Sequence, residues 1–140
     1  MEYKKFGNVI AVRMDKGDEI LSGIREISLE HGIKLATVSA IGAVSEFATG
    51  IYRAETKDYI VNEFKGDYEI VSLLGNINTM NDEHYSHIHF SASDVNGNVV
   101  GGHLNRAIVS ATCEMFIHIA DGCVDRKFND EVGLNVLSFE

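Results

Sequence analysis

Hydrophobic and polar residues along the chain indicate one helix among many strands. Between Asp18 and His31, apolar residues recur every three or four positions, with charged residues on the opposite side. This spacing is typical of an amphipathic helix. We therefore predict a helix over this stretch, with Asp15 or Asp18 capping its start. Gly32 suits the left-handed position that follows the end of a helix.

Most other segments are predicted to be β-strands, because short apolar or alternating runs are separated by turn residues. The expected strands cover residues 9–14, 35–41, 47–53, 58–64, 68–77, 85–94, 98–104, 108–120 and 133–139. Gly42 is expected to break or bulge the strand before it, and Lys65-Gly66-Asp67 to form a tight turn. The pattern predicts the α+β class, a mostly antiparallel sheet with one flanking helix, in a single domain over residues 1–140.

The segment from Ile108 to Ala120 is long and largely apolar. We expect it to be buried on both of its faces. Because a chain of 140 residues has little interior to cover a second face, this strand suggests a subunit interface and therefore a homo-oligomer.

Composition is that of an ordinary globular protein, with 45% hydrophobic and 24% charged residues. The two cysteines, Cys113 and Cys123, are too few for a disulfide framework and are expected to be reduced thiols. The start of the sequence lacks the apolar stretch of a signal peptide, and no segment is apolar enough to span a membrane. We expect a cytoplasmic protein without a membrane partner. The net charge of −9 argues against a protein that wraps DNA or RNA, because such a protein needs a basic face.

Candidate chemistry is concentrated in a run that contains His84, His87 and His89. Side chains on a strand alternate between its two faces, so His87 and His89 point to the same side. Two imidazoles in this arrangement are a common beginning of a site for zinc or another divalent metal. His84 is expected to be a loop residue.

The turn between residues 94 and 98 decides whether His103 joins the pair. A two-residue turn at Asn96-Gly97 would place His103 on the opposite face. A three-residue loop with Gly97 in the left-handed position would instead place His103 directly opposite His89. Gly101 and Gly102 would then allow close approach of a backbone or ligand. Three histidines leave the fourth position of a zinc ion open; the alternative is a set of solvated or hydrogen-bonded histidines.

A second candidate pair is Glu114 with His118, which share one face of the strand over residues 108–120. Such a pair can perform acid–base catalysis. It can equally be a hydrogen-bonded pair at a subunit interface, and we favour that interpretation. Cys113 alternates with apolar residues and is expected in the core, whereas Cys123 is expected in a loop.

Several segments, taken in order, resemble the plant and prokaryote conserved (PPC) domain. They are Arg13 to Gly32, Ser39-Ala40-Ile41-Gly42-Ala43, Tyr68 to Asn76, His87-Ile88-His89 and Gly101-Gly102-His103-Leu104. The resemblance covers about residues 8 to 120, and its specificity lies in the combination of these segments.

The resemblance implies a compact antiparallel sheet with a flanking helix that assembles as a homotrimer. In plants the domain follows an AT-hook in nuclear DNA-binding proteins, and free-standing prokaryotic members are linked to DNA binding by that association. In prokaryotic members similar to this one, the histidines that match His87, His89 and His103 form a metal site, with zinc expected. Only Met1 to Asn8 precede the predicted domain, so no AT-hook is expected, and DNA binding does not transfer directly.

Three functions are therefore open. The favoured hypothesis is a trimeric, metal-binding PPC module with a DNA-associated or regulatory role through protein or nucleic-acid partners. The second is a small metal-dependent enzyme, with Glu114 as a weak candidate for the general base. The third is a trimer whose metal is only structural. We lean away from an enzyme.

Overall fold

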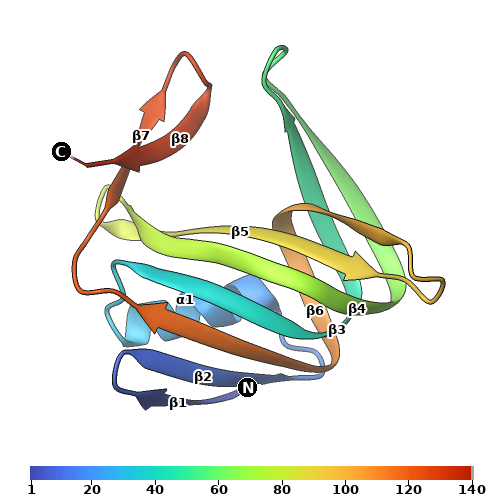
Figure 1. The fold of residues 1–140 in the computed structure, drawn as a ribbon. Helices are drawn as coiled ribbons and strands as arrows, with labels where there is room; N and C mark the ends of the chain where they lie inside the picture. Colours follow the sequence, from blue (N-terminus) through green and yellow to red (C-terminus); the bar gives the residue numbers. More distant parts are fainter. Residues whose placement is uncertain (140) are drawn as a thin grey trace.

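The computed structural model describes residues 1–139, which form one helix and eight strands (Figure 1). In chain order they are β1 (Glu2–Phe6), β2 (Val9–Asp15), α1 (Ile20–Glu30), β3 (Ala36–Arg53), β4 (Asp58–Met80), β5 (Glu83–Ser93), β6 (Val99–Ile119), β7 (Asp125–Asn129) and β8 (Leu134–Ser138). This confirms the α+β class and the single early helix. No helix in the described part of the chain is long and apolar enough to cross a membrane.

One antiparallel sheet contains six strands in the order β1-β2-β6-β3-β4-β5. Strand β5 also pairs with the first part of β6, so β6, β3, β4 and β5 close into a ring. Aromatic side chains fill the interior, where the Phe47 ring lies 5.0 Å from that of Phe90 and 4.8 Å from that of Phe64. The ring of strands is thus a packed core that fixes the position of β5 against β6.

Helix α1 buries its apolar face against this core, because Ile20, Ile24 and Ile27 are fully inaccessible. Each such side chain contributes about 1.5–3 kcal/mol when it is removed from water. The helix starts later than predicted, and its N-terminal cap is Glu19. The two expected caps, Asp15 and Asp18, instead each form an ion pair with the amino group of Met1 at 3.0 Å.

The long strands β3, β4 and β6 were each predicted as two shorter ones. Bulges replace the expected interruptions: the register of β3 against β4 shifts between Ala40 and Gly42. The predicted tight turn at Lys65-Gly66-Asp67 was wrong, because β4 continues through these residues. Gly66 has a φ of 138° and lies where the β3–β4 register shifts opposite Val44 and Glu46. A glycine with positive φ serves a bulge as well as a turn.

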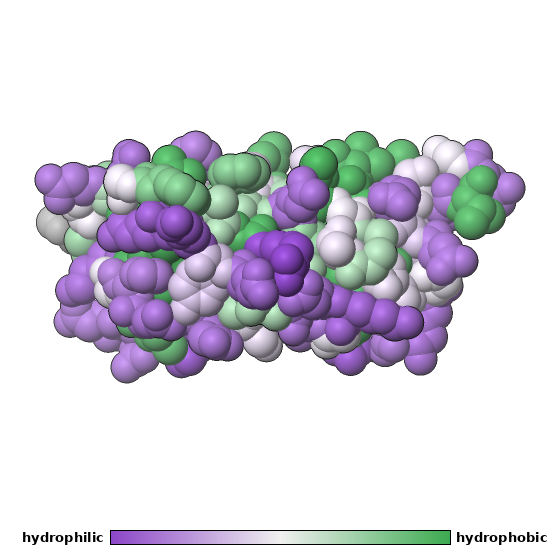
Figure 2. All heavy atoms as spheres, turned by 90° about the horizontal axis from the view of Figure 1, so that it is seen from below, coloured by the Kyte–Doolittle hydropathy of each residue, from purple (hydrophilic) through white to green (hydrophobic). Residues whose placement is uncertain are grey.

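The second half of β6 buries only one of its faces within one chain, so the expected burial of its second face depends on a contact with another subunit. Cys113, Met115 and Ile117 are fully buried, whereas Phe116 between them is 47% exposed. Strand registers place Phe116, Ser39 and Leu74 in one row across the sheet. We call this side of the sheet, with Ile41, Val71, Leu74 and Phe116 exposed on it, the open face. In Figure 2, green apolar surface gathers along one rim of the molecule, and purple polar surface covers most of the rest.

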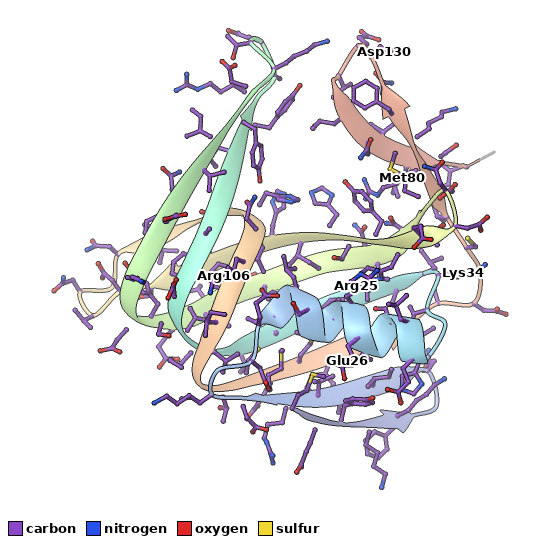
Figure 3. All side chains as sticks on the ribbon, turned by 180° about the vertical axis from the view of Figure 1, so that it is seen from behind. Arg25, Glu26, Lys34, Met80, Arg106 and Asp130 are labelled. Atoms are coloured by element: carbon purple, nitrogen blue, oxygen red, sulfur yellow. The ribbon has the colours of Figure 1, made fainter. Side chains whose placement is uncertain are left out.

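Two hairpins project from the same side of the sheet, beyond β5 (Figure 1). One is the far end of β3 and β4, and the other is the separate β7–β8 sheet. Their ends are joined by two hydrogen bonds. Tyr52 Oη donates to the carbonyl oxygen of Val132, and Lys57 Nζ donates to that of Asp130, both at 2.7 Å. Figure 3 shows Asp130 at the tip of the β7–β8 hairpin. The space between the hairpins is therefore bridged at its outer end.

Candidate metal centre

The β5–β6 hairpin has the three-residue loop on which the histidine prediction depends. The amide of Gly97 donates to the Asp94 carbonyl oxygen, and the amide of Asp94 to that of Asn98, both at 3.0 Å. Gly97 has a φ of 81°, the left-handed conformation expected there. The Asp94 carboxylate reinforces the loop by accepting the Asn98 amide at 2.9 Å. This loop confirms the predicted register.

In that register His89 faces His103 across the two strands, and Ser91 faces Gly101. Gly101 allows the close strand approach that we expected, since a Cβ there would lie 2.2 Å from the carbonyl oxygen of Phe90. The structure thus brings the histidine from β6 to the same place as the two from β5. The convergence depends on the strand register, because a shift by one residue would turn His103 to the other face of the sheet.

The three imidazoles converge closely enough to share one metal ion. One nitrogen from each of His87, His89 and His103 lies within 4.8 Å of the other two. The His87 ring centroid is 5.1 Å from each of the other two rings, and those two are 5.9 Å apart. Nitrogens bound tetrahedrally to zinc at about 2.0–2.1 Å are separated by about 3.3 Å.

Burial keeps two of these histidines in the neutral form that a metal needs. Burial, followed by the charges of His103, Arg126 and His89, lowers the pKa of His87 to about 4. Burial, followed by the charge of His89, also lowers the pKa of His103. At pH 7 a proton therefore does not compete for the lone pairs of His87 and His103.

A pocket of about 570 Å³ opens beside the histidine cluster. Both projecting hairpins line it, with Tyr52 and Tyr59 on one side and Arg126 and Leu134 on the other. Tyr59 lies flat against Gly50, where any Cβ would overlap its ring, and its hydroxyl donates to Asn105 Oδ1 at 2.8 Å. Sequence reasoning missed the contribution of β7 and β8, because no local pattern links those strands to the histidines.

A fourth protein ligand is absent from the cluster among residues 1–139, where the metal-ligating group consists of the three histidines alone. No carboxylate or cysteine of the described chain lines the pocket. A metal held by these residues would therefore keep a coordination position open toward the pocket.

The other candidates lie elsewhere. Glu114 and His118 are exposed on the open face, where Glu114 lies opposite Ile41 of β3, and neither lines the histidine pocket. Cys113 is in the core, as predicted, and burial raises the pKa of its thiol to about 11. His84 is not a loop residue: it lies in β5, and both of its ring nitrogens are buried without a hydrogen-bond partner in the described structure.

Comparison with known proteins places this chain in a family. The model of the Plants and Prokaryotes Conserved (PCC) domain matches residues 1–121. The chain belongs to this family. It is the family written PPC above, and the match includes all three histidines. No protein with a curated description matches the chain.

Three solved structures illustrate the similarity of this PPC chain to prokaryotic proteins. A candidate DNA-binding protein from Bacteroides thetaiotaomicron is 30% identical with a TM-score of 0.96, over 99% of this chain and 96% of that one. A metal-containing protein from Archaeoglobus fulgidus is 33% identical with a TM-score of 0.86, over 97% of both chains. A PPC protein from Pyrococcus horikoshii is 28% identical with a TM-score of 0.82, over 96% and 94%.

Proposed function

We propose that this PPC protein is a homotrimeric module that binds one divalent metal ion per chain through His87, His89 and His103. The observation that carries the proposal is the convergence of three imidazole nitrogens within 4.8 Å beside an open pocket. The metal content of the Archaeoglobus relative supports it. Zinc is the metal we expect, because imidazole in a tetrahedral site with one open position suits zinc.

The open face supports the proposed trimer. Ile41, Val71 and Leu74 on this face are each more than half exposed, next to Phe116. Exposed apolar side chains that share one groove are typical of a surface that contacts another protein. His89 lies opposite Leu74 in the sheet register, so the metal centre borders this face. We therefore propose that a second copy of the chain covers the face and assembles next to the metal centre.

A DNA-associated role is proposed to act through a partner protein. The Bacteroides relative is a candidate DNA-binding protein, yet three of the basic residues here are paired with carboxylates. Arg106 and Lys65 both pair with Glu46, and Arg13 pairs with Glu2 and Asp15. A net charge of −9 per chain opposes approach to phosphate.

A metal-dependent enzyme is the second candidate, and the open coordination position in the pocket favours it. A metal bound there would activate water or polarise a carbonyl group. The titratable residues that line the pocket are the three histidines, Arg126 and three tyrosines. Since Glu114 lies outside the pocket, residues 1–139 of one chain supply no carboxylate base there, and binding remains the function that the site supports best.

Elemental analysis of the untagged protein tests the proposed metal site. The wild type is expected to contain about one zinc per chain, and His89→Ala and His103→Ala to lose it. His118→Ala is the matched control, because this exposed histidine lies outside the cluster. Unchanged metal content in both cluster variants would place the metal elsewhere, and a metal-free wild type would refute the proposal.

A further inference from the structure

Arg126 of β7 is a buried cation whose hydrogen bonds all reach neutral groups. Only 7% of this residue is exposed. Its Nε donates to Asn78 Oδ1 at 2.8 Å, Nη1 to the carbonyl oxygen of Asn135 at 2.7 Å, and Nη2 to Asn76 Oδ1 at 3.1 Å. Its guanidinium carbon also lies 4.6 Å from the centre of the Tyr85 ring. These contacts fix the side chain against β4 and β5.

The positive charge of Arg126 has no counter-ion among the described residues. None of the ion pairs among residues 1–139 involves Arg126, so no carboxylate of these residues lies within 4.0 Å of its guanidinium. Buried charges in proteins are normally paired. Amide and carbonyl oxygens satisfy three of the five N–H groups of an arginine but do not neutralise its charge.

The pocket beside the histidines gives a ligand access to this charge. Arg126 lines it together with Tyr85, and the apolar wall consists of Ile51 from β3 and Leu134 from β8. The volume of about 570 Å³ lies within the range of small-molecule sites, which are mostly apolar with a few fixed polar groups. An arginine held in place binds a carboxylate or phosphate with two parallel hydrogen bonds.

We propose that this pocket binds a small organic anion, with its carboxylate or phosphate at Arg126 and its apolar body against the tyrosines and aliphatic side chains of the two hairpins. Arg126 and Leu134 lie beyond residues 1–121, which the family model matches, whereas Ile51, the tyrosines and the histidines of the lining lie within them. The site requires the pocket and Arg126 and does not require a metal at the histidines. Both hairpins contribute to it, so the interhairpin hydrogen bonds of Tyr52 and Lys57 hold the pocket in shape.

Ligand-observed NMR on chelator-treated, metal-free protein tests the proposal. Benzoate and phenyl phosphate are the anionic probes, and benzamide is the neutral counterpart of benzoate. Both anions are expected to bind, and benzoate at least about tenfold more tightly than benzamide, as expected for a charge-assisted contact. Titration should also shift the Nε–Hε resonance of Arg126 in labelled protein. Equal binding of benzoate and benzamide, or no saturable binding of either anion at millimolar concentration, would overturn the proposal.

Two variants test whether the charge of Arg126 is responsible for benzoate binding. Arg126→Gln should weaken benzoate binding at least about tenfold and leave benzamide unaffected. Arg106→Gln is the control, because this exposed arginine pairs with Glu46 and lies at the base of the β3–β4 hairpin, away from β7 and β8 (Figure 3). Full benzoate affinity in folded Arg126→Gln would refute the assignment. If that variant does not fold, the proposal is tested on the wild type by the difference in affinity between benzoate and benzamide and by the change in the Arg126 Nε–Hε resonance. Metal content is measured separately, so failure of the anion site leaves the metal proposal standing.

Discussion

Substitutions at two neighbouring residues of β6 should distinguish an effect on assembly from an effect on folding. Phe116 is 47% exposed on the open face, and Ile117 beside it is fully buried in the core. A phenylalanine presents about 200 Å², so about 90 Å² of Phe116 remains for a partner to cover. At about 25 cal/mol per Å² this burial contributes about 2 kcal/mol per subunit and about 7 kcal/mol per trimer. Phe116→Asp should therefore weaken the proposed trimer by about five orders of magnitude while the monomer stays folded.

Ile117→Asp is expected to behave differently. It removes a buried side chain and introduces an unpaired charge, which together cost at least about 3 kcal/mol of the 5–15 kcal/mol that stabilise a typical domain. We expect a strongly lowered melting temperature or no folded protein.

Light scattering at micromolar concentration measures assembly, and circular dichroism measures folding. Phe128→Asp is the control, since Phe128 is 57% exposed but belongs to β7, outside the large sheet. A wild-type monomer, or a Phe116→Asp protein that is still trimeric, would refute the assigned interface.

Two further predictions concern pH and DNA. Unfolded histidine titrates near pH 6.5, whereas burial lowers the pKa of His87 in the folded protein to about 4. Between these two pH values the unfolded chain binds a proton that the folded chain does not. The metal-free protein should therefore lose stability as the pH falls through this window. Thermal melts should show a shallower loss in His87→Gln, and an identical pH slope in both proteins would contradict the assignment. Fluorescence anisotropy at about 150 mM salt should show only weak, nonspecific binding to duplex DNA, in the micromolar range or above. Submicromolar affinity with a steep salt dependence would reveal a basic surface that the net charge conceals.

The histidine register was predictable from sequence because two local signals agree. Gly97 favours the left-handed position of a three-residue loop, and His87 and His89 alternate with core residues on a strand. Together they determine which residue of β6 faces His89. Glycine alone is less informative, since the sequence predicts a turn at Gly66, which instead lies at a bulge inside β4.

Other parts of the molecule depend on contacts that no local pattern records. Strand β1 is polar and mostly exposed, and it is held by pairing with β2. Strand β7 is short, and hydrogen bonds to Asn76 and Asn78, which are far away in the sequence, help to hold its Arg126 at the histidine pocket. The apolar pattern of β6 predicts burial on both faces but does not distinguish a core from a subunit interface, because an apolar residue such as Phe116 fits both equally well.

The position of a bound metal ion tests the central claim most directly. Crystals of the untagged protein grown with zinc, measured on both sides of the zinc absorption edge, give a map in which only zinc is strong. We predict one peak per chain, bonded at about 2.0–2.1 Å to one nitrogen each of His87, His89 and His103. An empty cluster, or a zinc peak held by other residues, would contradict the account.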